Sequence, residues 1–172
     1  MNQDQNRIVL MAANGYHEEY LLDPAELGLI LPGSMVTVKM PGIVTSQAEH
    51  GMTTVEPLIV IENALIGATI NRPSRRGEVI LLYRGVPGDR YLLRAEVGSY
   101  RPGDTLYAKQ TPNGIYVSKT NTDDQLPFAL ADETFTITPD IVDLKDESTP
   151  DGLGRNEVPN GGVVNLLKVR LA

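Results

Sequence analysis

The sequence contains no cysteine and no tryptophan, and only two of its 172 residues are phenylalanine. Without cysteine, the chain cannot perform thiol catalysis, form a zinc–thiolate site or rely on a disulfide scaffold. The shortage of large aromatic side chains argues against a glycosidase cleft, which needs aromatic sugar platforms and a carboxylic acid of raised pKa. A chain of this length can still bury roughly 70% of its unfolded surface. We therefore expect one domain with an elaboration, held together by its hydrophobic core.

Long hydrophobic runs are missing as well. No apolar run approaches the length of a membrane-spanning helix. The first six residues, MNQDQN, are polar and lack the basic and then apolar order of a secretory signal. We expect a protein with no membrane partner that stays soluble where it is made.

The negative charge is concentrated in one segment. The whole chain carries a net charge of −7. Residues 122–159 contain ten acidic and two basic residues, so this segment carries −8 and the remainder +1. Seven arginines lie between positions 72 and 101, but acidic residues interrupt them and no aromatic ladder accompanies them. This pattern argues against nucleic acid as a direct partner, and it favours arginines on solvated strand faces or against an acidic protein surface.

Motifs of catalysis and of metal or cofactor binding are absent from the sequence. His17 and His50 lie far apart, and each has only glutamate close by, which is typical of surface histidines. There is no Gly-x-Ser-x-Gly elbow, phosphate loop or dinucleotide fingerprint. The acidic residues between 143 and 151 lack the Asp-x-Asp-x-Asp-Gly spacing of a calcium loop. We expect no catalytic residues, no metal and no cofactor; a small hydrolase would need a clustered acid, base and nucleophile.

Turn signals are strong and recur along the chain. Pro87-Gly88-Asp89 and Pro102-Gly103-Asp104 each precede an apolar run. Proline and glycine suit the two inner positions of a tight turn, and aspartate can bond nearby backbone amides. We interpret the two triplets as hairpin corners and as the only internal repetition. A separate Asn113-Gly114 pair between apolar runs predicts a further hairpin.

Many short apolar runs separated by Gly and Pro turns predict an all-β fold, either a compact β-barrel or a jelly-roll-like sandwich. We divide the chain into an extended N-terminal arm (1–30), a β core (31–121), a long acidic loop or excursion (122–160) and a C-terminal strand that returns to the core (161–172). Residues 16–22 suit either helical turns or an extended arm, and Asp23-Pro24 has the form of a short helix start. Within the acidic segment, 135–138 and 141–142 are candidate short strands.

Several phrases, read in order, resemble the small capsid decoration or head-stabilising cement proteins of tailed bacteriophages. They are NRIVL at 6–10, HEE at 17–19, LPGSMV at 31–36, IENALIGATI at 61–70, GEV at 77–79 and the two Pro-Gly-Asp triplets with Gly98 between them. The resemblance covers roughly residues 6–110. It fails at 71–76, where NRPSRR stands in place of the usual acidic, alanine-rich phrase.

The resemblance implies a non-enzymatic structural virion protein, assembled in the host cytoplasm, that binds the outer surface of the capsid and bridges neighbouring major capsid proteins. It implies a homotrimer at threefold positions, with a homodimer at twofold positions as the competing arrangement. A carbohydrate-binding or host-attachment β-sandwich on the virion remains the alternative function. The candidate contacts with the capsid or a neighbouring subunit are the N-terminal phrase and the arginines of the charge-reversed loop, namely Arg7, Ile8, Val9, Leu10, Arg72, Arg75 and Arg76.

Overall fold

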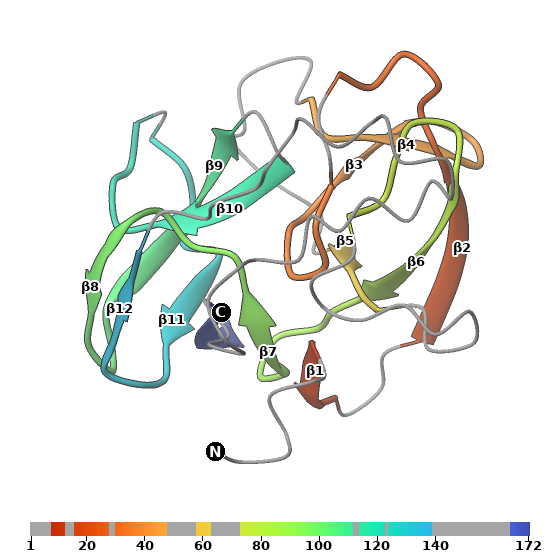
Figure 1. Cartoon of the computed structure of the whole chain (residues 1–172). Helices are drawn as coiled ribbons and strands as arrows, with labels where there is room; N and C mark the ends of the chain where they lie inside the picture. Colours follow the sequence, from red (N-terminus) through yellow and green to blue (C-terminus); the bar gives the residue numbers. More distant parts are fainter. Residues whose placement is uncertain are drawn as a thin grey trace.

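A computed structural model describes residues 8–12, 16–27, 30–47, 58–62, 73–111, 114–122, 124–138 and 166–172. In these residues all regular elements are β-strands, which confirms the all-β prediction (Figure 1). The strands are β1 (Val9–Met11), β2 (Tyr16–Leu22), β3 (Thr37–Met40), β4 (Ile43–Thr45), β5 (Leu58–Val60), β6 (Val79–Arg84), β7 (Arg90–Leu93), β8 (Gly98–Tyr100), β9 (Thr105–Thr111), β10 (Gly114–Ser118), β11 (Ala129–Ala131), β12 (Phe135–Ile137) and β13 (Leu167–Leu171).

The first five-stranded sheet curls into a small barrel. Its strand order is β3-β4-β2-β6-β5, with β2 parallel to β4 and antiparallel to β6. An antiparallel bridge between Met35, just before β3, and Ile59 in β5 joins the two ends of this order. The first barrel therefore closes around its own apolar cluster, made of Leu22, Ile30, Val36, Val44, Leu58, Val60, Ile80 and Leu82.

The second barrel lies beside the first and is built from the later strands (Figure 1). Its strands follow the order β7-β13-β11-β9-β10, and β1 pairs with the outer edge of β7. A parallel bridge between Ala95, just after β7, and Val117 in β10 joins the ends. The short strands β8 and β12 pair separately. Apolar side chains from these strands, including Tyr91, Leu93, Leu106, Val117 and Val169, belong to the larger hydrophobic cluster.

The two barrels repeat one topology. Each strand of the first barrel has a counterpart in the second: β2 corresponds to β7, β3 to β9, β4 to β10, β5 to β11 and β6 to β13. Corresponding strands have the same neighbours in the same directions. Internal repetition is thus wider than the Pro-Gly-Asp pair. Corresponding short phrases in the sequence are Pro32-Gly33 and Pro102-Gly103, and Lys39 and Lys109. The strand registers also match Asp23 with Glu96, Val44 with Val117, and Thr45 with Ser118.

The barrels contact each other through backbone and core. Met35 and Ile115 exchange two backbone hydrogen bonds of 2.9 and 3.1 Å, and the amide of Arg94 donates to the Gly33 carbonyl at 2.7 Å. Gly33 has a φ of +88°, and a Cβ there would lie 2.9 Å from Leu166 Cδ2 and 3.1 Å from the Leu92 carbonyl oxygen. Glycine is needed at this position both for its conformation and for the close approach of the two barrels.

The Pro-Gly-Asp triplets form tight turns, but the prediction of hairpin corners is wrong. The first triplet connects β6 of one barrel to β7 of the other, and the second connects β8 to β9, which do not pair. In each turn the glycine amide donates to the carbonyl of a residue in a distant strand, and the aspartate carbonyl accepts the amide of that same residue. This residue is Leu171 for the first turn and Ala131 for the second. The turns therefore attach to strands that lie far along the sequence.

Two predictions for the N-terminal arm are also wrong. Residues 16–22 form β2, an internal strand with β4 on one side and β6 on the other, so this part of the arm belongs to the first barrel. Residues 23–27 form a turn, not a helix. The Asp23 carboxylate accepts a bond from the Ala25 amide, while the Glu26 side chain is held by β4, which stops the segment from continuing as a helix.

The acidic segment contains more sheet than its composition suggests. Residues 135–137 form β12, as predicted, and residues 129–131 form β11, which the sequence reading left within the loop. β11 lies between β9 and β13 in the second barrel. The C-terminal strand is confirmed as β13. The candidate strand at 141–142 and the most acidic stretch, 143–160, lie outside the described residues.

Candidate interaction surfaces

The predicted N-terminal contacts take part in the chain's own fold. Ile8 is fully buried, donates its amide to Glu62 Oε2 and accepts the Leu92 amide at its carbonyl. Val9 and Leu10 are half-buried in β1, which pairs with β7. Ile8 therefore does not present its side chain to a partner, because it fills the core between the barrels. Arg7 lies outside the described residues.

The charge-reversed loop ends in a tight turn at residues 75–78. Arg75 is half-buried, and its amide donates to Glu78 Oε2 at 3.1 Å. Arg76 is exposed at the second position of the turn. The turn is anchored to β2, since Gly77 donates to the Leu22 carbonyl and the Leu22 amide donates to the Glu78 carbonyl. Of the predicted arginines, Arg76 is thus exposed on a fixed backbone, and Arg72 lies outside the described residues.

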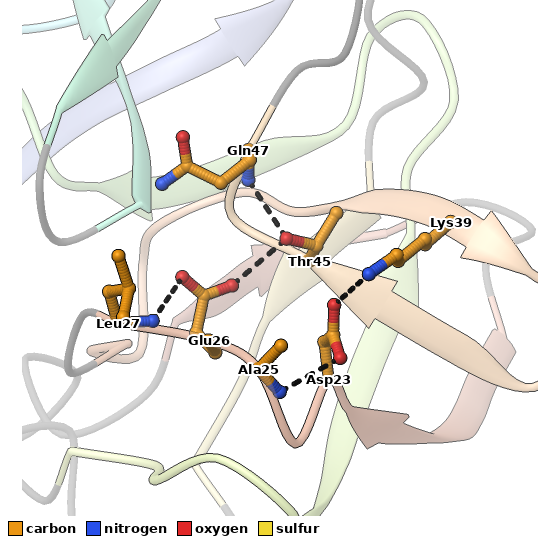
Figure 2. Close-up of a pocket in the computed structure, with 7 residues that line it drawn as sticks. All are labelled: Asp23, Ala25, Glu26, Leu27, Lys39, Thr45 and Gln47. Carbon is orange, nitrogen blue, oxygen red and sulfur yellow. Dashed lines mark hydrogen bonds and ion pairs between the residues drawn. The ribbon is translucent and has the colours of Figure 1, made fainter.

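A pocket of about 170 Å³ lies at the end of β2, beside β3 and β4 (Figure 2). On one side of it Lys39 Nζ donates to Asp23 Oδ2, and this bond holds the pKa of the Asp23 carboxyl below its usual value, with help from the Ala25 amide. The other lining residues are Glu26, Leu27, Thr45 and Gln47. The sequence reading did not single out this pocket, although the helix-like start at Asp23 lies on its rim.

Glu26 ties the segment after β2 to the end of β4. Glu26 is 4% exposed. Its carboxylate accepts the Thr45 hydroxyl at 3.0 Å, the Ser46 amide at 2.8 Å and the Ser46 hydroxyl at 2.6 Å. These bonds make Glu26 a structural cross-link between the two segments.

The second barrel carries a similar cross-link at Glu96. Lys109 Nζ and the Ser118 hydroxyl both donate to this carboxylate, and the first of these bonds is the main reason that the pKa of Glu96 lies below its ordinary value. By strand register Glu96, Lys109 and Ser118 correspond to Asp23, Lys39 and Thr45 of the first barrel. In both barrels the lysine donates to the acidic residue at the same position, which indicates a repeated structural element.

Most of the described tyrosines are unavailable as binding platforms. Tyr83, Tyr91, Tyr100 and Tyr116 are each less than 9% exposed. The Tyr91 hydroxyl donates to Asp89 Oδ2 at 2.9 Å, and burial together with this anion raises the pKa of Tyr91. Burial also raises the pKa of Tyr100, to about 12. These rings fill cores, so they cannot serve as the stacking surfaces that a glycan site requires.

In the described part of the chain, no group of three or more His, Asp or Glu side chains is arranged to hold a metal ion. This part also contains no helix long and apolar enough to cross a membrane.

An apolar row crosses the outside of the first barrel. The strand registers place Met40 opposite Ile43, Ile43 opposite Leu21, and Leu21 opposite Val79. Met40 and Val79 are 49% and 60% exposed. We call these four residues the apolar row. The sequence could not locate it, because its members come from β3, β4, β2 and β6 and meet only through the pairing of those strands.

Comparison of the sequence with models of protein families and with curated proteins gave no match.

Proposed function

We propose that this chain is a non-enzymatic capsid decoration protein of a tailed bacteriophage, which binds the outer surface of the assembled head and bridges neighbouring major capsid proteins. The observation that carries the proposal is the position of the resembling phrases. LPGSMV at 31–36, GEV at 77–79 and the Pro-Gly-Asp triplets all fall on the tight turns that anchor one strand to another. The phrases at these turns therefore help to build the scaffold.

The chemistry of the polar groups supports a binding role over a catalytic one. The carboxylates of Glu26 and Glu96 and the hydroxyls of Ser46 and Ser118 bond to each other within their barrels. Among the described residues, these two serine–carboxylate pairs fasten loops, one in each barrel. A protein that clamps a shell by many weak contacts needs rigid surfaces, which such cross-links provide.

The best candidate for a capsid contact is Arg76. Its side chain is exposed on a turn whose backbone is bonded to β2, so it can meet an acidic capsid surface at little conformational cost. Arg76→Glu should lower occupancy on expanded capsids. The matched control is Arg170→Glu, a charge reversal at an exposed site of the second barrel.

Occupancy can be measured by sedimenting expanded capsids with each purified variant and quantifying the bound chain. The proposal predicts saturable binding of the unaltered chain to capsids and a weaker association for Arg76→Glu than for Arg170→Glu. Failure of the unaltered chain to bind its own capsids would refute the proposed function. Equal binding of the two variants would remove Arg76 from the contact surface. The proposed homotrimer is tested separately, by the mass of the purified chain in solution.

A further inference from the structure

The pocket at the end of β2 combines an ion pair with an exposed apolar side chain. Lys39 donates to Asp23 on one side of the pocket, and Leu27 lines the other side (Figure 2). Leu27 is 93% exposed, although leucine is among the residues most often buried in folded proteins. A ligand that fills the pocket would therefore cover an apolar side chain and contact two charged groups.

The repeated topology shows how this ion pair differs from its counterpart in the second barrel. By strand register, Asp23, Lys39 and Thr45 correspond to Glu96, Lys109 and Ser118. The Glu96 carboxylate accepts from both the lysine and the hydroxyl of its barrel. Asp23 is one methylene shorter, and in the first barrel the Thr45 hydroxyl donates to Glu26 instead. The hydroxyl that bonds to the carboxylate in the second barrel is thus turned away from it in the first.

Asp23 keeps acceptor capacity on the pocket side. Among the described residues, its carboxylate accepts from Lys39 and from the Ala25 amide. A carboxylate has about four acceptor positions, so about two remain. The Asp23 side chain is 12% exposed and lines the pocket, so a donor placed in the pocket can reach it.

The size and the charges of the pocket favour a neutral aromatic ligand with one donor. The pocket has a volume of about 170 Å³, and an apolar cavity of about 150 Å³ is large enough to hold benzene. Lys39 repels a cationic ligand, and Asp23 repels an anionic one. A phenol avoids both costs, because its hydroxyl can donate to the carboxylate while the ammonium group attracts the face of its ring.

The apolar row runs along the edge of the pocket. Asp23 lies two residues beyond Leu21, and Thr45 lies two residues beyond Ile43. Leu21 and Ile43 pair in the parallel register of β2 and β4, and alternate residues of an extended strand lie on the same face. A single side chain in the pocket leaves the row uncovered, whereas a polypeptide that carries this side chain can cover both.

We propose that the pocket binds the side chain of a tyrosine presented by a partner protein. The phenol hydroxyl donates to Asp23, the ring lies between Leu27 and the ammonium group of Lys39, and residues next to the tyrosine lie on the apolar row. Tyrosine suits such an anchor position because it joins a large apolar area to one hydrogen-bonding group. The inference does not rest on the proposed capsid binding, since any protein with a suitably exposed tyrosine could supply the anchor.

Titration of the isotope-labelled full chain, followed by NMR, tests the pocket with single side chains. We expect N-acetyltyrosinamide to shift the amides of Ala25, Leu27 and Gln47 saturably, and to bind about tenfold more tightly than N-acetylphenylalaninamide, which lacks the hydroxyl. Asp23→Asn should remove most of this preference. Absence of saturable shifts at these amides, equal binding of the two ligands to the natural chain, or tighter binding of N-acetylargininamide would overturn the proposal.

Two exposed leucines provide a matched pair of variants for the ring contact. Leu27→Asn should weaken the binding of N-acetyltyrosinamide by about threefold or more. The control is Leu126→Asn, at a leucine that is 69% exposed and does not line the pocket, and it should leave binding unchanged. Because both side chains are exposed, neither substitution removes a core contact. Equal affinities of the two variants would overturn the placement of the ring against Leu27.

A tripeptide with leucine on both sides of tyrosine tests whether the ligand is a protein segment. It should bind several-fold more tightly than N-acetyltyrosinamide, because the leucines reach the apolar row. Met40→Ser with Val79→Ser should abolish this gain and leave the affinity for N-acetyltyrosinamide unchanged. A tripeptide that binds no more tightly than the single side chain would overturn the assignment to a protein partner. These titrations contain no capsids, so their outcome is independent of capsid binding.

Discussion

Two turns of the same design differ in burial, and this difference leads to a quantitative prediction. In the turn at 86–89 the Asp89 carboxylate accepts the Val86 amide at 3.1 Å and the Tyr91 hydroxyl at 2.9 Å, and the residue is 1% exposed. In the turn at 101–104, Asp104 Oδ2 accepts the Arg101 amide at 3.0 Å, but this bond is solvent-exposed. The substitutions Asp89→Ala and Asp104→Ala therefore remove the same aspartate-to-amide bond, once from a buried turn and once from an exposed turn.

The two aspartate substitutions should differ several-fold in how much they lower the free energy of unfolding. Asp89→Ala leaves an amide and a buried hydroxyl without their acceptor, and each such group costs about 1–3 kcal/mol, so we expect a loss of roughly 2–6 kcal/mol in the free energy of unfolding. For a chain of this size that lowers Tm by several degrees. Asp104→Ala lets water replace the lost acceptor, so its cost should be about 1 kcal/mol or less.

Urea unfolding followed by circular dichroism measures both values on the purified chain. Adding Tyr91→Phe to Asp89→Ala should recover part of the loss, because the orphaned hydroxyl is removed together with its acceptor. Equal costs for the two aspartate substitutions would refute the reasoning. So would a double variant that is as unstable as the sum of its single changes.

Three further predictions concern the interface, the Glu96 cross-link and the N-terminal strand. Gly33→Ala and Gly103→Ala each strain a positive φ, at about 1–2 kcal/mol. Only Gly33→Ala also forces a Cβ against the Leu92 carbonyl. Chemical unfolding should therefore show that Gly33→Ala lowers the free energy of unfolding by about 1–3 kcal/mol more than Gly103→Ala. The Lys109 and Ser118 bonds hold the pKa of Glu96 below its usual value of 4.5, so its stabilisation is fully present above pH 4.5 and is lost as the pH falls through the lowered folded-state pKa. Glu96→Gln should cost at most about 1 kcal/mol at pH 7, and the difference should shrink in melts at pH values progressively below 4.5. Ile8→Ala should lower stability by roughly 2–4 kcal/mol, whereas exposed Val79→Ala should change it by about 0.5 kcal/mol or less in the same assay.

Local sequence signals predicted strands and turns well. The C-terminal strand β13 and the short strand β12 lie within the ranges where the sequence placed them, and β9 and β10, on either side of the Asn113-Gly114 signal, form the predicted antiparallel pair. These features depend on neighbouring residues: side-chain alternation sets the strand, and glycine with asparagine sets the tight turn. The all-β class follows from their number.

Features that depend on distant partners could not be predicted in this way. The Pro-Gly-Asp turns were recognised as turns, but Gly88 and Gly103 bond to Leu171 and Ala131, which no local pattern identifies. β2 was ambiguous between helix and arm because its sequence does not alternate clearly, and pairing with β4 and β6 decides its form. Glu26 looked like part of a helix start, yet Thr45 and Ser46 hold its side chain.

The repeat was hidden for a related reason. Corresponding phrases in the two barrels are short, and insertions of different length separate them, so the sequence shows no repeat of constant period. Strand order exposes the duplication because topology persists where side chains have diverged. The candidate surfaces differ from those expected, because N-terminal Ile8 is buried in the core, while Leu21 and Ile43, which the sequence did not single out, are only half-buried.

Electron cryomicroscopy of the phage particle on which we propose that this protein binds tests the proposed function most directly. The proposal predicts density on the outer surface of the head into which two adjoining five-stranded barrels fit, in contact with more than one major capsid protein. Absence of the chain from mature heads, or its location inside the head or on the tail alone, would contradict it.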